Sequence, residues 1–274
     1  MFKSLKLVLL SIGSVLLVIY LLLVSYLYVN QESFIFQPET LSADYKFTFE
    51  GKFEELSISV EKDVNLNGVL FKADKGKGLI FYLHGNGGSI KGWSDIASTY
   101  NEMGYDIFIL DYRGYGKSDG KISGESQMFQ DLKKVYDYVL TVYPENKVII
   151  TGYSIGTGLA AMLASVNNPK GLVLQAPYYS LRETINSRMP LMPDFLQRYD
   201  FETHAFLEKV KSPVYIFHGT ADNVLPYSNA GKLKSEFKKG DVLITLDGQG
   251  HNGITDNQHF KTEFKKFADT VLEK

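Results

Sequence analysis

Residues 148–164 read VIITGYSIGTGLAAMLA: an apolar β-branched run, a G-x-S-x-G turn, and a run rich in alanine and leucine. This order predicts a strand, a sharp turn and a helix, an arrangement that holds a serine hydroxyl clear of the backbone. Both glycines are expected, because a side chain at Gly152 or Gly156 would collide with the neighbouring strand or helix. We therefore expect Ser154 to be a catalytic nucleophile. The alternative is a glycine-rich junction with a solvent-exposed serine.

Runs of apolar, β-branched and aromatic residues predict eight strands, at 55–60, 67–72, 79–83, 106–110, 147–151, 171–175, 213–217 and 241–246. From the third run onward they alternate with stretches of helical apolar spacing, at 92–103, 127–142, 155–165, 228–237 and 257–272. Such alternation predicts an α/β fold with a mostly parallel eight-stranded sheet and helices on both of its faces. No linker divides the chain after its N-terminal segment, so we expect one domain over residues 30–274.

One interval interrupts this alternation, between the strands predicted at 171–175 and 213–217. It contains Pro190 and Pro193, which disfavour one continuous helix. We expect a short lid insertion at about 179–211, because long loops at the C-terminal edge of such a sheet commonly cover a site.

The N-terminal segment contains 23 consecutive uncharged residues, at positions 7–29. As a helix they would extend about 34 Å, enough to cross a bilayer core. No A-x-A-like cleavage site follows, so we expect a transmembrane anchor over 1–29, with a cleaved signal peptide as the alternative. Lys3 and Lys6 precede the span and Glu32 is the first charge after it. The positive-inside bias thus predicts a single-pass protein with a cytoplasmic N-terminus and an extracytoplasmic domain over 30–274, to whose core the helix contributes nothing.

Two loops that follow predicted strands carry an acid and a histidine. Asp222 lies in HGTADNVLP (218–226), and His251 lies in DGQGHNG (247–253). The chain order of serine, acid and histidine suits a nucleophile on a strand-turn-helix motif. We expect His251 to be the general base that takes the serine proton, and Asp222 to orient its imidazole. Asp247 is the alternative orienting residue.

The loop after the strand at 79–83 reads HGNGG (84–88). Glycines there let the main chain approach a substrate, and this loop supplies one backbone N–H of an oxyanion hole. The second N–H comes from the residue after the nucleophile, so Asn86 and Ile155 are the expected donors. A phosphate-binding glycine loop is the alternative, but neither of the usual glycine patterns is present.

Composition and charge exclude several other classes of function. The formal net charge is -2 with no block of like charges, so nucleic acid is not an expected partner. The chain has no cysteine, which excludes disulfides and thiolate chemistry. No cluster of residues has the spacing of metal ligands, so we expect no metal and no cofactor. The other histidines are interpreted as structural or surface residues, and they are His84, His204, His218 and His259.

With these motifs, the chain resembles the α/β-hydrolase superfamily over about 66–273, and most of all its short-lidded, membrane-anchored serine hydrolases. The segment DYRGYGKSDG (111–120) also matches this group, in which that loop is structural. We expect Asp111 and Arg113 to pair locally. The superfamily includes esterases, lipases, thioesterases and peptidases, so the resemblance does not identify the substrate.

The leading expectation is hydrolysis of a carboxylic ester through an acyl-enzyme, with a small-molecule or lipid-like acyl substrate taken beside the membrane. Six apolar residues in and near the insertion are expected to form an acyl pocket, with lid packing as their alternative role: Tyr178, Tyr179, Leu181, Met189, Leu191 and Phe195. One alternative function is an amidase or peptidase of the same mechanism. Another is a catalytically silent, membrane-tethered interaction protein. Nothing in the sequence identifies a protein partner.

Overall fold

The predicted strands form one eight-stranded sheet in the computed structural model of the chain, which describes residues 2–272. The strands are β2 (Lys52–Glu61), β3 (Val64–Lys72), β4 (Leu79–Leu83), β6 (Asp106–Leu110), β7 (Val148–Tyr153), β8 (Gly171–Gln175), β9 (Val214–Gly219) and β10 (Val242–Leu246). Their order across the sheet is β10-β9-β8-β7-β4-β6-β3-β2. β3 is antiparallel to β2 and β6, and the other neighbouring pairs are parallel. The predicted sheet is therefore confirmed.

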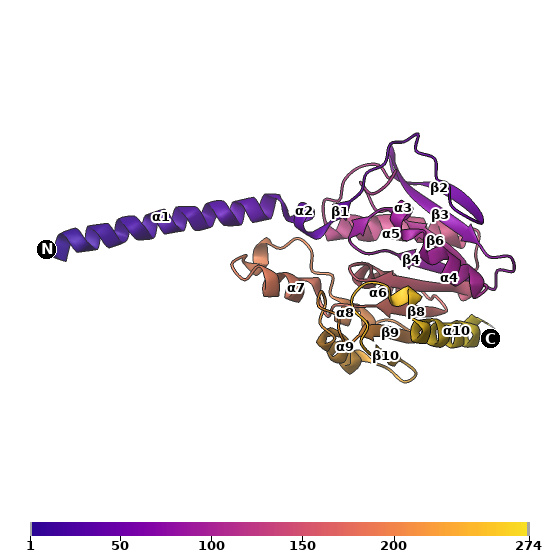
Figure 1. Cartoon of the computed structure of the whole chain (residues 1–274). Helices are drawn as coiled ribbons and strands as arrows, with labels where there is room; N and C mark the ends of the chain where they lie inside the picture. Colours follow the sequence, from indigo (N-terminus) through magenta and orange to yellow (C-terminus); the bar gives the residue numbers. More distant parts are fainter. Residues whose placement is uncertain (1, 273–274) are drawn as a thin grey trace.

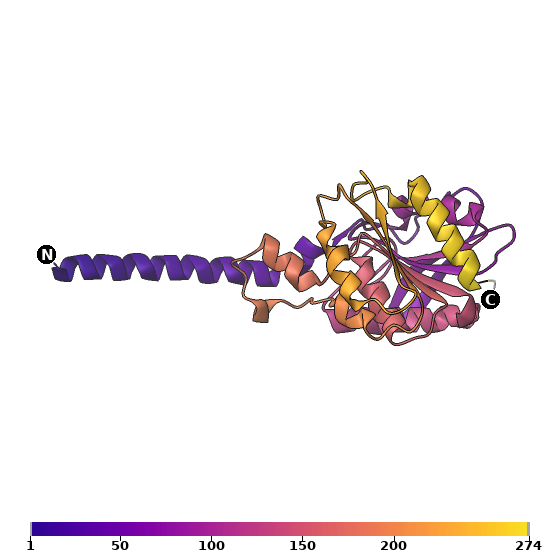
Figure 2. The same cartoon turned by 90° about the horizontal axis from the view of Figure 1, so that it is seen from below.

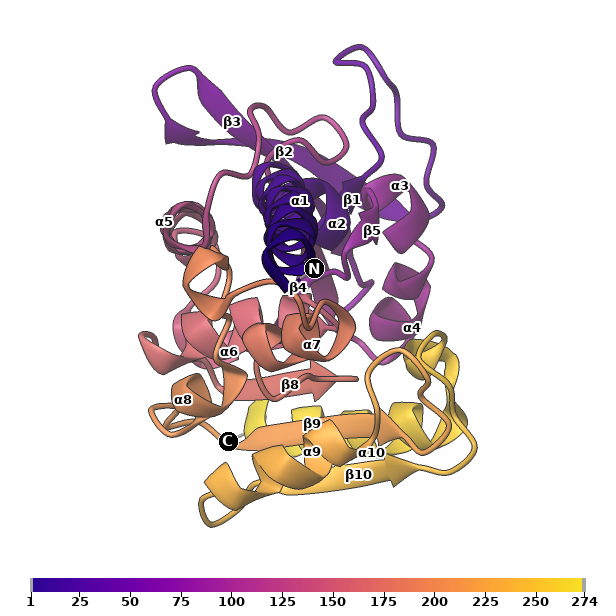
Figure 3. The ribbon, with the colours of Figure 1, turned by 90° about the vertical axis from the view of Figure 1, so that its left-hand side faces the viewer.

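Helices cover both faces of the sheet, as predicted (Figure 3). Buried side chains pack on one face from α3 (Ile90–Trp93), α4 (Ile96–Glu102) and α10 (Gln258–Leu272). Buried side chains pack on the other face from α5 (Glu125–Leu140), α6 (Gly156–Ser165) and α9 (Ser228–Leu233). The single helix predicted over 92–103 is two helices, because Ser94 and Asp95 between them favour helix ends over helix interiors.

The turn between β7 and α6 brings the main chain of α6 against β4 and β7. A Cβ atom at Gly156 would overlap the carbonyl oxygen of Leu83 and lie 2.7 Å from that of His84. A Cβ atom at Gly152 would overlap the carbonyl oxygen of Gly156. Only glycine fits at either position, which confirms the steric interpretation of this motif. Ser154 has a φ of 52°, in the left-handed region that side chains seldom adopt.

The N-terminal helix α1 (Phe2–Val29) extends away from the sheet, and most of its apolar side chains are exposed (Figures 1 and 2). Within the described residues, Lys3–Val29 is one helix that is long and apolar enough to cross a membrane. A membrane anchor and a signal sequence share these two properties. The structure thus bears out the length and apolar character that the sequence predicts for this segment.

Two short elements connect α1 to the sheet, namely α2 (Gln31–Ile35) and β1 (Gln37–Pro38). β1 pairs in parallel with β5 (Gly87–Gly88), which lies in the glycine loop after β4. Neither element is predicted from the sequence, because a two-residue strand that contains proline has no alternating pattern. The chain just after α1 is therefore part of the folded domain and holds the glycine loop.

The insertion between β8 and β9, here called the lid, contains α7 (Leu181–Arg188), the 3-10 turn η2 (Asp194–Leu196) and α8 (Thr203–Leu207). It lies beside the C-terminal end of α1 (Figures 1 and 2). Gln31 Nε2 donates to Leu196 O at 2.7 Å, and the Arg198 N–H donates to Gln31 Oε1 at 3.0 Å. Glu32 accepts hydrogen bonds from the Arg198 guanidinium at 2.8 Å and the Tyr199 hydroxyl at 2.7 Å. The junction after α1 is thus bonded to the lid.

The last turns of α1 also contact the lid. Val24 is buried, and the Tyr20 hydroxyl donates to Leu191 O at 3.3 Å. The expectation that this helix contributes nothing outside a bilayer is therefore wrong for its C-terminal end. The reason is that the lid reaches back along the helix, which no local pattern in the sequence reports.

We predict that Gly156→Ala destabilises the protein by about 1–3 kcal/mol or more, because the added methyl group must displace the main chain of β4 and the glycine loop. Thermal and denaturant unfolding would measure the loss. Gly92→Ala is the matched control, since a Cβ atom at Gly92 meets nothing within 4 Å. Equal effects of the two substitutions would contradict the steric explanation of the motif.

Candidate active site

Three loops at the C-terminal ends of β7, β9 and β10 bring Ser154, Asp222 and His251 together. His251 Nε2 lies 3.0 Å from Ser154 Oγ, and His251 Nδ1 lies 2.7 Å from Asp222 Oδ2. Ser154 and Asp222 are buried, and the His251 side chain is only 9% exposed. In this arrangement of two hydrogen bonds, an imidazole can accept a serine proton while a carboxylate fixes the tautomer of the imidazole. The structure thus brings together the predicted nucleophile, base and orienting acid.

The main chain holds Ser154 in its unusual conformation from both sides. Its N–H donates to Gln175 O at 2.9 Å, at the end of the neighbouring strand β8. Its carbonyl oxygen accepts from the Thr157 hydroxyl at 2.6 Å and the Thr157 N–H at 3.0 Å. Backbone strain of this kind persists only where the surroundings enforce it, and such positions cluster at active sites.

Asp222 is positioned by the turn that follows β9. Its Oδ1 accepts from the N–H groups of Val224 at 2.9 Å and Leu225 at 2.8 Å. Its Oδ2 faces His251, and His218 Nε2 lies 3.3 Å away. Burial alone would raise the pKa of Asp222, but hydrogen bonds with His218 and His251 outweigh burial and hold this pKa well below its usual range. The carboxyl group is therefore ionised at neutral pH, as an orienting group requires.

The loop after β10 is held to the turn that carries the serine. The Tyr153 hydroxyl donates to His251 O at 2.5 Å, and Gln249 Nε2 donates to Asn252 O at 2.7 Å. Gly253 has a φ of 79°, so a glycine is needed where this loop turns back toward the helix. Within the described residues, the imidazole of His251 bonds to Asp222 and not to Asp247, the alternative orienting residue.

The two expected oxyanion donors, Asn86 and Ile155, line the same pocket as Ser154. Neither of their backbone N–H groups has an acceptor among residues 2–272, so both are available to a substrate oxygen. The Asn86 carbonyl does have partners: it accepts from the Tyr115 hydroxyl at 2.7 Å and the Gln37 N–H at 2.9 Å. These two bonds fix the Asn86 carbonyl in the glycine loop.

The segment 111–120 is hydrogen-bonded to the glycine loop through two tyrosines. Besides Tyr115, Tyr112 contributes a hydroxyl that donates to His84 O at 2.9 Å. The expected pairing of Asp111 with Arg113 does not occur. Asp111 is fully buried with His84 Nε2 3.5 Å away. Arg113 turns instead toward α5 and β2, where it binds Asp131 at 2.6 Å and Glu61 at 2.9 Å.

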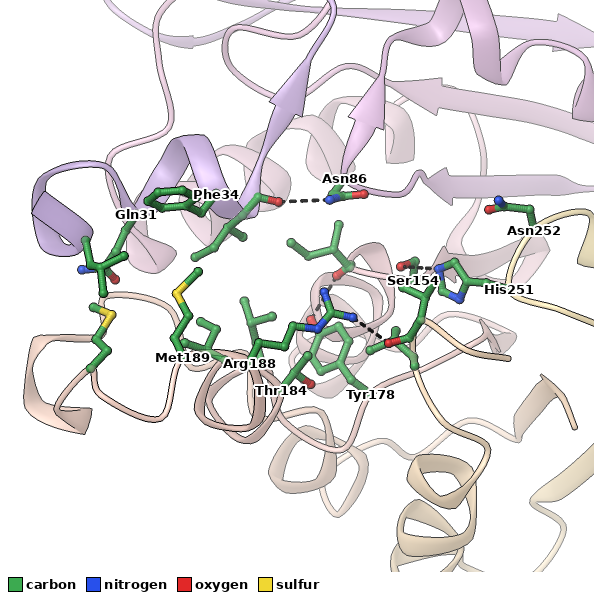
Figure 4. Close-up of a pocket in the computed structure, with 18 residues that line it drawn as sticks. Gln31, Phe34, Asn86, Ser154, Tyr178, Thr184, Arg188, Met189, His251 and Asn252 are labelled. Carbon is green, nitrogen blue, oxygen red and sulfur yellow. Dashed lines mark hydrogen bonds between the residues drawn. The ribbon is translucent and has the colours of Figure 1, made fainter. Parts of the chain in front are cut away.

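A cavity of about 330 Å³ opens beside Ser154 (Figure 4). Three of the six predicted acyl-pocket residues line it, and they are Tyr178, Leu181 and Met189. The structure does not bring the other three to the cavity: Tyr179 stacks on His204, while Leu191 and Phe195 are 60% and 84% exposed on the lid.

Residues that the sequence did not indicate form much of the cavity wall. The end of α1 and the helix α2 contribute Leu27, Gln31, Phe34 and Ile35. The lid adds Thr184, Ile185, Arg188 and Met192, and the turn after β9 adds Val224 and Leu225. Leu181, Ile185 and Arg188 repeat at helical spacing on α7, so that face could have been found from the sequence. The contribution of α1 had no local signal.

No group of three or more histidine, aspartate or glutamate side chains within residues 2–272 is arranged to hold a metal ion. The absence of a metal and of a cofactor stays a prediction from the sequence. The arrangement described above requires neither for acyl transfer.

Comparison with known proteins gives a family match and several relatives. The family model described as Serine aminopeptidase, S33, matches residues 74–200. That range contains the glycine loop and the turn of Ser154, and it ends before Asp222 and His251.

Two curated relatives carry the name Alpha/beta hydrolase domain-containing protein. Protein 17C of Xenopus tropicalis is 30% identical over 204 residues, which are 70% of this chain and 62% of that protein. Protein 17B of Homo sapiens is 29% identical over 203 residues, which are 70% of this chain and 67% of that protein. The chain thus spans less than two thirds of the Xenopus relative's length.

Two solved structures share the architecture. An esterase of Pyrococcus furiosus has a TM-score of 0.68 and 18% sequence identity, over 87% of this chain and 98% of that chain. Est1E of Butyrivibrio proteoclasticus has a TM-score of 0.63 and 18% identity, over 80% of this chain and 98% of that chain. At such identities the likeness shows the fold alone. The fold, the family model and the curated relatives agree that this chain belongs to the α/β-hydrolase superfamily.

Proposed function

We propose that the protein hydrolyses carboxylic esters through an acyl-enzyme formed on Ser154. His251 Nε2 takes the hydroxyl proton as the serine oxygen attacks the ester carbonyl, and it returns that proton to the leaving alcohol. Water then attacks the acyl-enzyme with the same histidine as base. Asp222 fixes the imidazole tautomer and stabilises the imidazolium that forms. The observation that carries this proposal is the pair of hydrogen bonds made by the His251 imidazole. Its Nε2 lies 3.0 Å from Ser154 Oγ, and its Nδ1 lies 2.7 Å from Asp222 Oδ2.

In this mechanism, the N–H groups of Asn86 and Ile155 stabilise the negative charge that develops on the carbonyl oxygen. Their lack of acceptors among the described residues supports the assignment. One such donor is typically worth about 2.7–4 kcal/mol in the transition state. A side-chain substitution cannot remove a backbone donor. A substitution of Tyr115 would, however, remove the hydrogen bond from its hydroxyl that holds the Asn86 carbonyl.

The walls of the cavity support an apolar acyl group as the part of the substrate held beside Ser154. Aliphatic and aromatic side chains approach from α7, from the turn after β9 and from the end of α1. Because α1 has the length and composition of a membrane span, we propose that it anchors the protein and that the substrate is a small molecule or lipid-like ester at the bilayer surface. The positive charges before α1 favour an extracytoplasmic domain.

An amidase or peptidase of the same mechanism is the second candidate, since the matching family model is described as a serine aminopeptidase. The same three residues would carry both reactions. Rates on nitrophenyl esters and on peptide amides distinguish them. A catalytically silent interaction protein is disfavoured, because the imidazole of His251 is hydrogen-bonded to both the Ser154 hydroxyl and the Asp222 carboxylate.

We predict that Ser154→Ala abolishes ester hydrolysis and labelling by a fluorophosphonate probe while the fold is retained, because the substitution only removes a hydroxyl group. Labelling, ester turnover and circular dichroism would be measured on the same preparation. Retained labelling in the variant would disprove the nucleophile assignment, and an unlabelled wild-type protein would favour the silent interaction protein.

We predict that kcat/KM falls as the solution is acidified, because an imidazolium has no free nitrogen lone pair with which to accept the serine proton. The pKa of Asp222 is below its usual range, so this carboxylate stays ionised and does not cause the fall. His251→Ala should lower kcat by about 10⁴-fold or more. His259→Ala, on the exposed side of α10, should change little, and the reverse ranking would refute the assignment of the base.

We predict that a chain beginning at Glu32 hydrolyses a short water-soluble ester but loses activity on a long-chain ester dissolved in liposomes. Truncation removes the tether, which raises local concentration, and it also removes Leu27 and Gln31 from the cavity wall. The full-length variants Leu27→Ala and Gln31→Ala keep the tether, so they separate the two causes. Equal losses on both esters would show that α1 is required by the folded enzyme itself.

A further inference from the structure

Arg188 differs in charge from every other residue of the cavity. Within the described chain, eighteen residues line this space, and Arg188 is the single lysine, arginine, aspartate or glutamate among them. No carboxylate side chain therefore lines the cavity beside it. A substrate in this cavity meets one permanent positive charge in otherwise neutral, mostly apolar surroundings.

The guanidinium of Arg188 keeps most of its hydrogen-bonding capacity free. Its one hydrogen bond within residues 2–272 runs from Nη2 to Val224 O at 2.7 Å. The other two arginines of the lid are paired with carboxylates, Arg182 with Asp200 and Arg198 with Glu32. A guanidinium has five N–H donors in a planar fork, so at least one full edge of Arg188 remains available.

A single hydrogen bond links the exposed Arg188 side chain to the turn that carries the proposed orienting acid. Val224 accepts from Arg188 through its carbonyl and donates its own N–H to Asp222 Oδ1 at 2.9 Å. The Arg188 side chain therefore rests on the same turn that carries the proposed orienting acid. In Figure 4 it extends from α7 across the cavity toward the side on which Ser154 lies.

We propose that Arg188 is a specificity-determining residue that binds an anionic group, phosphate or carboxylate, on the alcohol part of the ester. This inference rests on the proposed ester hydrolysis. The apolar walls take the acyl chain, which leaves the charged group of an amphiphilic substrate to the one cation present. Guanidinium binds the paired oxygens of phosphate or carboxylate through two parallel N–H···O bonds. The substrate class is thus an acyl ester of an anionic alcohol.

The test compares three hexanoyl esters, of glycerol, glycerol 3-phosphate and glyceric acid, on full-length protein in a neutral detergent. The acyl group is constant, and no lipid headgroup is present. The wild-type kcat/KM should be higher for the phosphate or the carboxylate ester than for the neutral ester. Comparing the two anionic esters then shows whether phosphate or carboxylate is preferred. Arg188→Gln should lower this ratio by about 10- to 100-fold, chiefly through KM, as expected for charge-assisted hydrogen bonds to arginine.

Lys209→Gln is the matched control, because it removes one positive charge from an exposed position outside the cavity. Its ratio should equal that of the wild type. Arg188→Lys, which keeps the charge and loses the fork, should restore only part of the preference. Labelling by the fluorophosphonate probe counts the active sites in each preparation.

A second measurement does not depend on the folding of a variant. Octyl phosphate should inhibit wild-type hydrolysis of the neutral ester at least about tenfold more strongly than 1-octanol does. Hydrolysis of all three esters without an anionic preference, or an equal loss of preference in Lys209→Gln, would overturn the role of Arg188 and leave ester hydrolysis standing. Failure to hydrolyse any of the three esters would overturn the proposed function together with this inference.

Discussion

The close approach of two main chains, α6 against β4 and β7, is the constraint on which the rest of the structure depends. It requires glycine at positions 152 and 156, where any side chain would overlap carbonyl oxygens. It forces Ser154 into a left-handed backbone conformation that points the hydroxyl away from the sheet. It also brings the glycine loop after β4 next to the start of α6, so that Asn86 and Ile155 line one pocket.

The parts of the molecule governed by this constraint were predictable from sequence. A buried strand, a tight turn and a helix each leave a local pattern, and so do the loops after β9 and β10 that carry Asp222 and His251. The eight strands followed for the same reason, since strands buried on both faces are continuously apolar. The hydrogen bonds among Ser154, His251 and Asp222 were expected from their chain order and not from spacing.

The parts that escaped prediction are those made by contacts between distant segments. β1 is two residues long, and it is a strand only because it pairs with β5 in the glycine loop. Leu27 looks like any other apolar residue of α1, yet the lid places it in the cavity wall. Asp111 and Arg113 are close in sequence but point to different neighbours, because burial directs the carboxylate inward and α5 attracts the guanidinium. Local sequence patterns do not show which distant residues a side chain will contact.

The bonds from Gln31 and Glu32 to the lid join the segment just after α1 to the wall of the cavity. A long linker would hold the domain at a variable distance from a membrane, whereas here Leu27, at the end of the helix, is itself part of the cavity wall. With α1 in a bilayer, the cavity would therefore lie at the lipid surface. Turnover would then follow the mole fraction of ester within the leaflet, a two-dimensional quantity, and would be insensitive to the volume of the surrounding solution.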